Sequence, residues 1–186
     1  MKTLLVKTLL ARLAGIVLLV ALLAPALWSC NSETAFAKAQ REQTEQYKAI
    51  DDTIIRNYLV RRNITNYTRT ESGLYLINTA AGTGPFIVTG NQVQVRYIGR
   101  LLGNDRTGQV FESTYDNHTA CQCNVFPVGG QIQGWNEGLL LMQAGTRKTL
   151  LIPSYLAYGP SGGGPGSPIG PNQPLLFEME IARVLP

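Results

Sequence analysis

The stretch Val93-Gln94-Val95-Arg96-Tyr97-Ile98-Gly99 decides the fold, because its first five residues alternate between apolar and polar side chains. A period of two is typical of a β-strand that buries one face and exposes the other. We therefore predict a half-buried strand here, with Tyr97 on the buried face.

Segments on both sides of this strand carry similar signals. We predict further strands at 74–79, 110–111, 149–152 and 175–184. Residues 135–143 change to a helical period, since Trp135, Leu139 and Met142 fall on one face. Several antiparallel strands with one short central helix make an α+β domain.

The first 29 residues have the pattern of a targeting segment. Three basic residues precede the uncharged run 13–28, as in a secretory signal. The run ends in Leu27-Trp28-Ser29-Cys30, which resembles the bacterial lipoprotein box and predicts a lipidated Cys30 that anchors the chain in a membrane. An uncleaved signal anchor over 13–32 is the alternative. Both hypotheses place the remaining chain outside the cytoplasm, in the bacterial cell envelope.

The charge balance argues against a nucleic-acid partner. The formal net charge is +4, but three of the basic residues lie in the targeting segment. Residues 30–186 carry 13 basic and 12 acidic side chains, which leaves a net charge of +1. Such a surface lacks the basic footprint that phosphate binding requires.

Residues 30–67 are predicted to form a tether followed by an amphipathic helix. Residues 31–45 are polar, and a helical period begins near Tyr47 and ends near Ile64. The expected apolar face consists of Tyr47, Ile50, Ile54, Tyr58 and Leu59. Asp51 and Asp52 are expected on the solvated side. The helix either packs on its own domain or forms a homodimer or partner contact.

Two cysteines remain in the predicted domain, Cys121 and Cys123. Their spacing does not match a zinc site, because there is no second pair and His118 is the only histidine. A redox motif would normally place two residues between the cysteines. In an oxidising compartment they can pair with each other, in a structural or incidental role. We expect no metal and no cofactor.

Five motifs resemble, in order and spacing, those of the FKBP-type peptidyl-prolyl cis-trans isomerases over roughly residues 70–186. They are 93–99, Gly108-Gln109-Val110-Phe111-Glu112-Ser113-Thr114, Ile132-Gln133-Gly134-Trp135-Asn136-Glu137-Gly138, Ala157-Tyr158-Gly159 and Leu175-Leu176-Phe177-Glu178. The resemblance implies an FKBP-like antiparallel sheet wrapped around a short helix, with a domain at 68–186. It also implies isomerisation of X-Pro bonds in polypeptide clients.

The resemblance further implies an apolar pocket for a proline ring. Its catalytic residues would be Tyr97, Phe111, Glu112, Ile132, Trp135, Tyr158 and Phe177, and its substrate-binding residues Gln131 and Ile169. Trp135 would form the floor, while the Ile132 N–H and the Tyr158 hydroxyl would bind peptide carbonyls. The sequence departs from the family at Glu112, where Asp is usual, and at Asn124, which often is aromatic.

Two functions are compatible with these residues. The first is an envelope-anchored isomerase that assists the folding of exported proteins, because slow prolyl isomerisation limits folding. The second is a non-catalytic chaperone or envelope-complex subunit that grips proline-containing segments. A pocket that holds the planar and the twisted bond equally well binds without catalysing.

Overall fold

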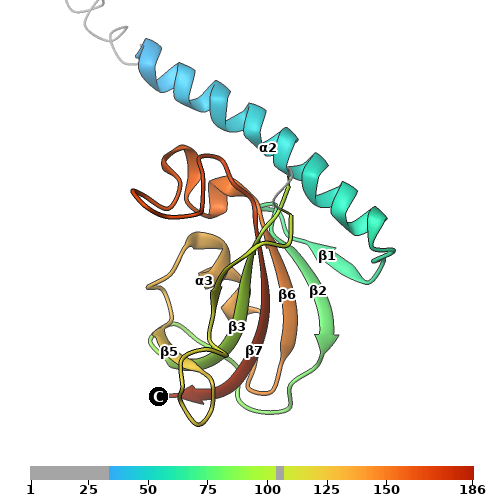
Figure 1. Ribbon diagram of the computed structural model, residues 1–186, viewed down its shortest axis with the longest axis vertical. Coiled ribbons are helices and arrows are strands. Elements are labelled where there is room, and N and C mark those ends of the chain that lie inside the picture. Colours follow the sequence, from blue (N-terminus) through green and yellow to red (C-terminus); the bar gives the residue numbers. More distant parts are fainter. Residues whose placement is uncertain (1–33, 104–106) are drawn as a thin grey trace, which may run out of the picture. The chain divides into compact units, whose positions relative to one another are not determined.

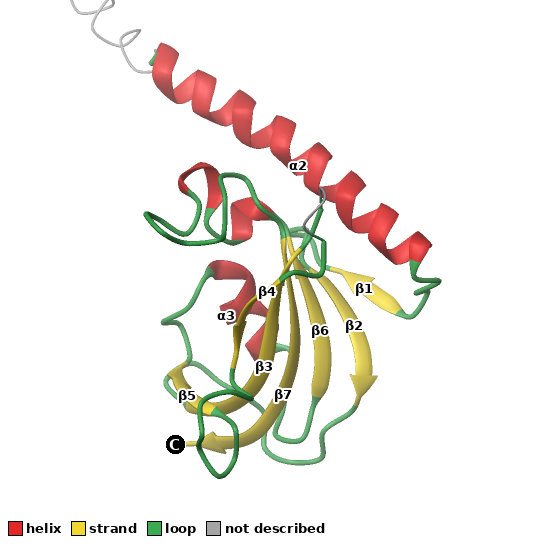
Figure 2. Cartoon of the chain, in the orientation of Figure 1, coloured by secondary structure: helices red, strands yellow, loops and turns green. Residues whose placement is uncertain are grey.

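The computed structural model describes residues 34–103 and 107–186, which form two α-helices, two 3-10 helices and a seven-stranded antiparallel sheet (Figures 1 and 2). The elements are α2 (Ala35–Arg61), β1 (Tyr67–Arg69), β2 (Tyr75–Ala80), β3 (Gln92–Leu101), β4 (Val110–Ser113), β5 (Asn124–Pro127), α3 (Gln133–Leu140), β6 (Arg147–Ile152), η3 (Ser154–Leu156), η4 (Gly159–Ser161) and β7 (Leu175–Leu185). The predicted signal peptide at 1–29 and the predicted lipidation site Cys30 lie outside the described residues. Within the described ranges, no helix is both long and apolar enough to cross a bilayer.

Strand β3 pairs with three other strands, more than any other strand of the described sheet. The strand order is β1-β2-β6-β7-β3-β4, and β5 also pairs with β3. One edge of β3 pairs with β7 along its whole length. The other edge pairs with β4 at Ile98–Arg100 and with β5 at Gln92–Val95, so that these two short strands follow one another along the same edge.

The sheet buries apolar residues on both faces where β2, β6 and β7 run together. Alternate residues of β6 show this directly, because Leu150 and Ile152 pack in one cluster with Trp135, while Leu151 packs in the other with Ile55. Successive side chains of a strand point to opposite faces. Helix α3 therefore covers one face, and the part of α2 that carries Ile55 covers the other.

Two glycines allow α3 to lie very close to β6. A Cβ atom at Gly134 would stand 2.5 Å from Ile152 Cγ2, and one at Gly138 would stand 2.5 Å from Leu150 Cδ1. Any side chain here would push the helix away from the sheet. These glycines thus fix the depth at which Trp135 lies.

The strands predicted from alternation are confirmed, since β2, β3, β4, β6 and β7 overlap the five expected segments. The predicted short helix is confirmed as α3. The short strands β1 and β5 were not predicted, because three- or four-residue segments carry too little periodicity to be recognised.

The N-terminal helix differs from the prediction in extent and in orientation. It begins at Ala35, twelve residues before the expected start at Tyr47, because this segment is rich in Ala, Gln, Glu and Lys, which favour helix. Its buried side chains are Asp51, Ile55 and Leu59, whereas Ile50 is 40% exposed. The compact unit that contains the sheet begins at Gln43, so residues 43–61 belong to it. Dimerisation through this helix stays a prediction.

The expectation that Asp51 is solvated was wrong. Its side chain is fully buried, and Oδ2 accepts hydrogen bonds from the N–H and the hydroxyl of Ser154 at 2.8 and 2.7 Å. Burial raises the pKa of the Asp51 carboxyl, and the two hydrogen bonds from Ser154 oppose that shift. Asp52 remains at the surface side, where it pairs with Arg56 and Arg69.

Truncating the buried face of α2 will destabilise the domain. Ile55→Ala should lower the free energy of unfolding by about 2–5 kcal/mol, because a fully buried aliphatic side chain leaves a cavity against the sheet. Val60→Ala on the same helix is the control, since Val60 is 73% exposed and its loss should change stability by less than about 0.5 kcal/mol. Urea denaturation of the full chain measures both. Equal effects would show that α2 does not pack on the sheet.

Candidate active site

A hollow of about 190 Å³ opens beside α3 and is lined mainly by aromatic side chains. Its lining residues come from β3, β4, β5, the N-terminal end of α3, the segment after η3, and β7. They are Tyr97, Glu112, Phe126, Gln131, Ile132, Trp135, Tyr158 and Phe177. Larger depressions of about 360 and 450 Å³ occur elsewhere among the described residues, but only one aromatic side chain lines each.

The indole of Trp135 is the meeting point of this cluster. Its ring lies edge-to-face against three other rings, with centroid distances of 5.1 Å to Tyr97, 5.2 Å to Phe126 and 5.4 Å to Phe177. This geometry is the one that aromatic quadrupoles favour. Trp135 is only 3% exposed, and its Nε1–H is buried without an acceptor among the described residues.

The turn before α3 places this indole. Ile132 is the N-cap of α3, and its carbonyl accepts the N–H groups of Trp135 and Asn136. The Asn136 side chain donates to the carbonyl of Gln131 at 2.6 Å and accepts from the N–H groups of Gly129 and Gln131. Ile132 is therefore held in the lining, and the N–H of a helix N-terminus has no acceptor inside its own helix.

Two of the residues predicted for the site lie behind its lining. Phe111 packs edge-to-face on Phe177 with centroids 5.6 Å apart, and Gly99 makes room for it, because a Cβ there would stand 2.6 Å from Phe111 Cζ. Ile169 is 7% exposed and belongs to the main core. Neither side chain lines the hollow itself.

Tyr97 and Glu112 form the polar side of the hollow. Burial, and next the Glu112 carboxylate near its hydroxyl, raises the pKa of Tyr97 far above its usual range. The Asn124 side chain opposes the shift in this pKa. The phenol consequently stays neutral at physiological pH.

Tyr158 stands at the mouth of the hollow. Its side chain is 42% exposed, in contrast to the buried rings of Tyr97 and Trp135. Partial burial and then the negative charge of Glu112 raise the pKa of the Tyr158 hydroxyl. The group therefore remains a hydrogen-bond donor that a ligand in the hollow can reach.

Phe126 is a lining residue that was not predicted from the sequence. Phe126 reaches the hollow because β5 pairs with β3, which opposes Phe126 to Val93. Its ring then lies 5.9 Å from that of Tyr97 and 5.2 Å from that of Trp135.

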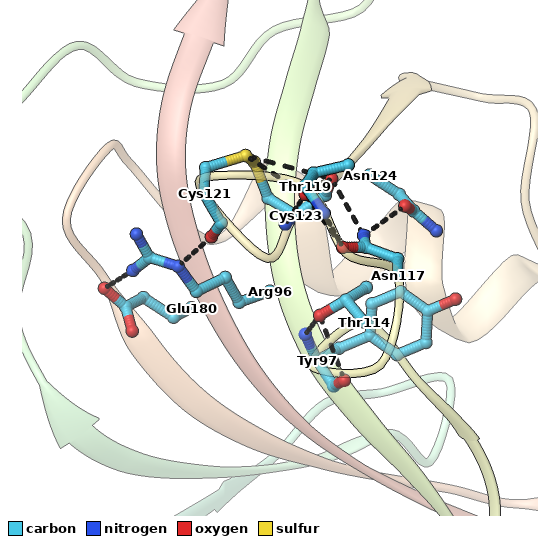
Figure 3. The surroundings of a disulfide bond; sticks show 9 residues. All are labelled: Arg96, Tyr97, Thr114, Asn117, Thr119, Cys121, Cys123, Asn124 and Glu180. Atoms are coloured by element: carbon cyan, nitrogen blue, oxygen red, sulfur yellow. Dashed lines mark hydrogen bonds and ion pairs between the residues drawn. A yellow bond between two sulfur atoms is a disulfide. The ribbon is translucent and has the colours of Figure 1, made fainter.

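The segment between β4 and β5 carries a disulfide between Cys121 and Cys123 (Figure 3). Around it, the Asn117 amide donates to Asn124 Oδ1 at 2.8 Å, and Arg96 Nε donates to the Cys121 carbonyl at 2.7 Å. Asn124 is the first residue of β5, so the disulfide-bearing loop is linked to the strand that carries the lining residue Phe126.

The lining suits binding and reorientation of an apolar group rather than covalent chemistry. The eight lining residues include no cysteine, serine or histidine that could act as a nucleophile or as its base. Rings enclose the base of the hollow, and an N–H at Ile132 and a hydroxyl at Tyr158 stand at its edge. A ligand with a compact apolar ring between two carbonyl groups would match this pattern.

Comparisons with known proteins agree with the geometry. The profile of a family described as FKBP-type peptidyl-prolyl cis-trans isomerase matches residues 84–182. The chain is 38% identical over 116 residues to the FKBP-type 22 kDa peptidyl-prolyl cis-trans isomerase of Escherichia coli strain K12, and 39% identical over 113 residues to the outer membrane protein MIP of Legionella longbeachae. These alignments cover 62% and 61% of this chain but 52% and 45% of the relatives, about half of their length.

A solved structure confirms the predicted α+β architecture. The peptidyl-prolyl cis-trans isomerase of Pseudomonas syringae pv. tomato superimposes with a TM-score of 0.61 and 30% sequence identity. The superposition covers 77% of this chain and 96% of the other. An antiparallel sheet around a short helix, with a helix before it, is thus shared.

Reducing the disulfide will cost little stability, because it closes a loop of only a few residues. Chain entropy assigns such a short loop about 1–2 kcal/mol. A thiol reductant should therefore lower the melting temperature of the full chain by a few degrees. The reductant should leave the melting temperature of the Cys121→Ser/Cys123→Ser variant unchanged. An equal response of both proteins would contradict the prediction.

Proposed function

Because this chain belongs to the FKBP-type peptidyl-prolyl cis-trans isomerase family, we propose that it accelerates cis-trans isomerisation of X-Pro bonds in the hollow around Trp135. The observation that carries the proposal is the convergence of Tyr97, Phe126 and Phe177 on that indole from three separate strands. A proline ring is compact and apolar, and it fits a socket of this kind.

The chemistry needs no covalent intermediate. The barrier to rotation is roughly 18–20 kcal/mol because the planar amide must lose its resonance. A twisted amide has less charge separation than a planar one, so that an apolar enclosure disfavours the ground state more than the transition state. Each reduction of the barrier by about 1.4 kcal/mol gives a tenfold faster reaction. Differential binding of the twisted form is sufficient.

The polar groups at the edge orient the peptide. We expect the Ile132 N–H and the Tyr158 hydroxyl to donate hydrogen bonds to carbonyls on either side of the proline. The Tyr97 ring is buried against Trp135 and Phe177 and stays neutral, so it presents no charge to the ligand. Gln131 lies beside Ile132 in the lining and offers a further contact to the backbone of the bound segment.

Removing the Tyr158 hydroxyl tests this assignment. Tyr158→Phe should lower kcat/KM about tenfold, because one hydrogen bond to the twisted peptide is worth about 1–1.5 kcal/mol. Tyr115→Phe is a matched control, since Tyr115 is 44% exposed and does not line the hollow. A protease-coupled assay on a short proline peptide measures both, with thermal melting to confirm that neither variant loses stability. Equal activity of the two variants would place the substrate elsewhere.

A non-catalytic proline-binding module is the second candidate. The polar side chains of Gln131 in the lining and of Asn124 against Tyr97 favour it, because they reduce the apolar character that catalysis by desolvation requires. Peptide binding without turnover by the wild-type full chain would select this function over the isomerase.

We place the protein in the bacterial cell envelope, attached through lipid on Cys30 and acting on exported polypeptides. The disulfide between Cys121 and Cys123 supports an oxidising compartment, because such bonds are rare in the cytosol. The similarity to an outer membrane protein is in accord with this location. Proline isomerisation is slow without a catalyst, so that folding chains in this compartment are suitable clients.

Mass spectrometry of the protein purified from bacterial membranes tests the anchor. We expect a mass that lacks residues 1–29 and contains acyl chains on Cys30, and we expect Cys30→Ser to keep the N-terminal segment and lack the acyl mass. Cys121→Ser/Cys123→Ser is the control and should remain acylated. A mature wild-type protein that begins at Met1 would refute the lipoprotein hypothesis.

A further inference from the structure

The buried carboxylate of Asp51 is not explained by the isomerase pocket or by stability. It comes from α2, is 0% exposed, and leaves Oδ1 without a partner among the described residues. Burying a carboxylate that is only half satisfied opposes folding. An apolar side chain of similar size at such a position is often neutral or stabilising. The presence of Asp51 therefore indicates that its second carboxylate oxygen, Oδ2, has a function.

That other oxygen holds the start of η3. Asp51 Oδ2 accepts both the N–H and the hydroxyl of Ser154, the first residue of η3. The Ser154 carbonyl in turn accepts the N–H of Ala157 at 3.0 Å. The next residue is Tyr158, whose side chain lines the hollow. Asp51 thus fixes the turn from which Tyr158 extends.

The same turn is tied to the helix that carries the indole. The Tyr155 hydroxyl donates to the carbonyl of Ser72 at 2.9 Å, and the Ser72 hydroxyl donates to Glu137 Oε2 at 2.7 Å. Glu137 lies on α3, two residues after Trp135. With the first residue of η3 held by α2 and its second residue linked to α3, the Tyr158 side chain has a defined position relative to the indole.

We infer that Asp51 is a positioning residue, which acts through Ser154 and η3 to hold the Tyr158 hydroxyl at the mouth of the hollow. The effect on turnover rests on the proposed isomerase function, whereas the effect on the position of Tyr158 does not. The helix α2 is in this view a part of the catalytic unit and not only a spacer.

A double-mutant cycle on the full chain tests the action on turnover. Asp51→Ala should lower kcat/KM about tenfold in the wild-type background, and by less than about twofold in the Tyr158→Phe background, where the hydroxyl is already absent. Asp51→Asn keeps an oxygen that can accept both hydrogen bonds, and it should retain most of the activity. Equal fold losses in both backgrounds would overturn the inference.

Asp52→Ala is the matched control. Asp52 is the next residue on α2 and also ties the helix to the domain, through Arg69 and the Tyr75 hydroxyl, but it does not hydrogen-bond Ser154. We expect it to lower the melting temperature while kcat/KM changes less than about twofold. A loss of turnover equal to that of Asp51→Ala would mean that general loosening of α2 is the cause.

A measurement that does not depend on turnover separates the positioning role of Asp51 from the proposed isomerase function. In full chain labelled with fluorotyrosine, Asp51→Ala should shift and broaden the ¹⁹F resonance of Tyr158, assigned through Tyr158→Phe, and should leave that of Tyr97 in place. Where Asp51→Ala does not fold, Ser154→Ala removes only the 2.7 Å hydroxyl contact and serves the same comparison. An unchanged Tyr158 resonance refutes the positioning role. A wild-type protein without turnover refutes only the proposed function.

Discussion

The edge-to-face packing of three rings around the Trp135 indole is the constraint on which the rest of the structure depends. The rings belong to β3, β5 and β7, so the sheet must bring three strands to one place. The indole itself reaches that place only because α3 lies close to β6 at Gly134 and Gly138. Fold and site are therefore consequences of the same packing.

Polar groups lie at one side and at the mouth of this hollow. Tyr97 is buried and keeps its proton beside the Glu112 carboxylate, and Asn124 accepts a hydrogen bond from Asn117 of the disulfide-bearing loop. At the mouth, the exposed Tyr158 hydroxyl and the Ile132 N–H remain available to a peptide. In the proposed function, an aromatic base with donors at its edge would favour a distorted imide over a solvated planar one.

Much of this could be predicted from the sequence, and the gaps have physical causes. Alternation revealed β3 and β7 because each buries a face along many residues. Phe126 was missed as a lining residue because its position depends on pairing of the four-residue β5 with β3, which local periodicity cannot show. Asp51 was misplaced because its partner Ser154 lies 103 residues away along the chain. Long-range contacts of polar groups leave no pattern in the sequence around them.

The most direct test observes the indole and the prolyl bond in one sample. Exchange NMR on a proline peptide with catalytic amounts of the full chain reports cis-trans interconversion, while the Trp135 indole N–H signal reports occupancy of the hollow. The account predicts accelerated exchange together with a shift of that signal that saturates with the peptide. Accelerated exchange with an unperturbed Trp135 signal would contradict it, because the reaction would then take place away from this socket.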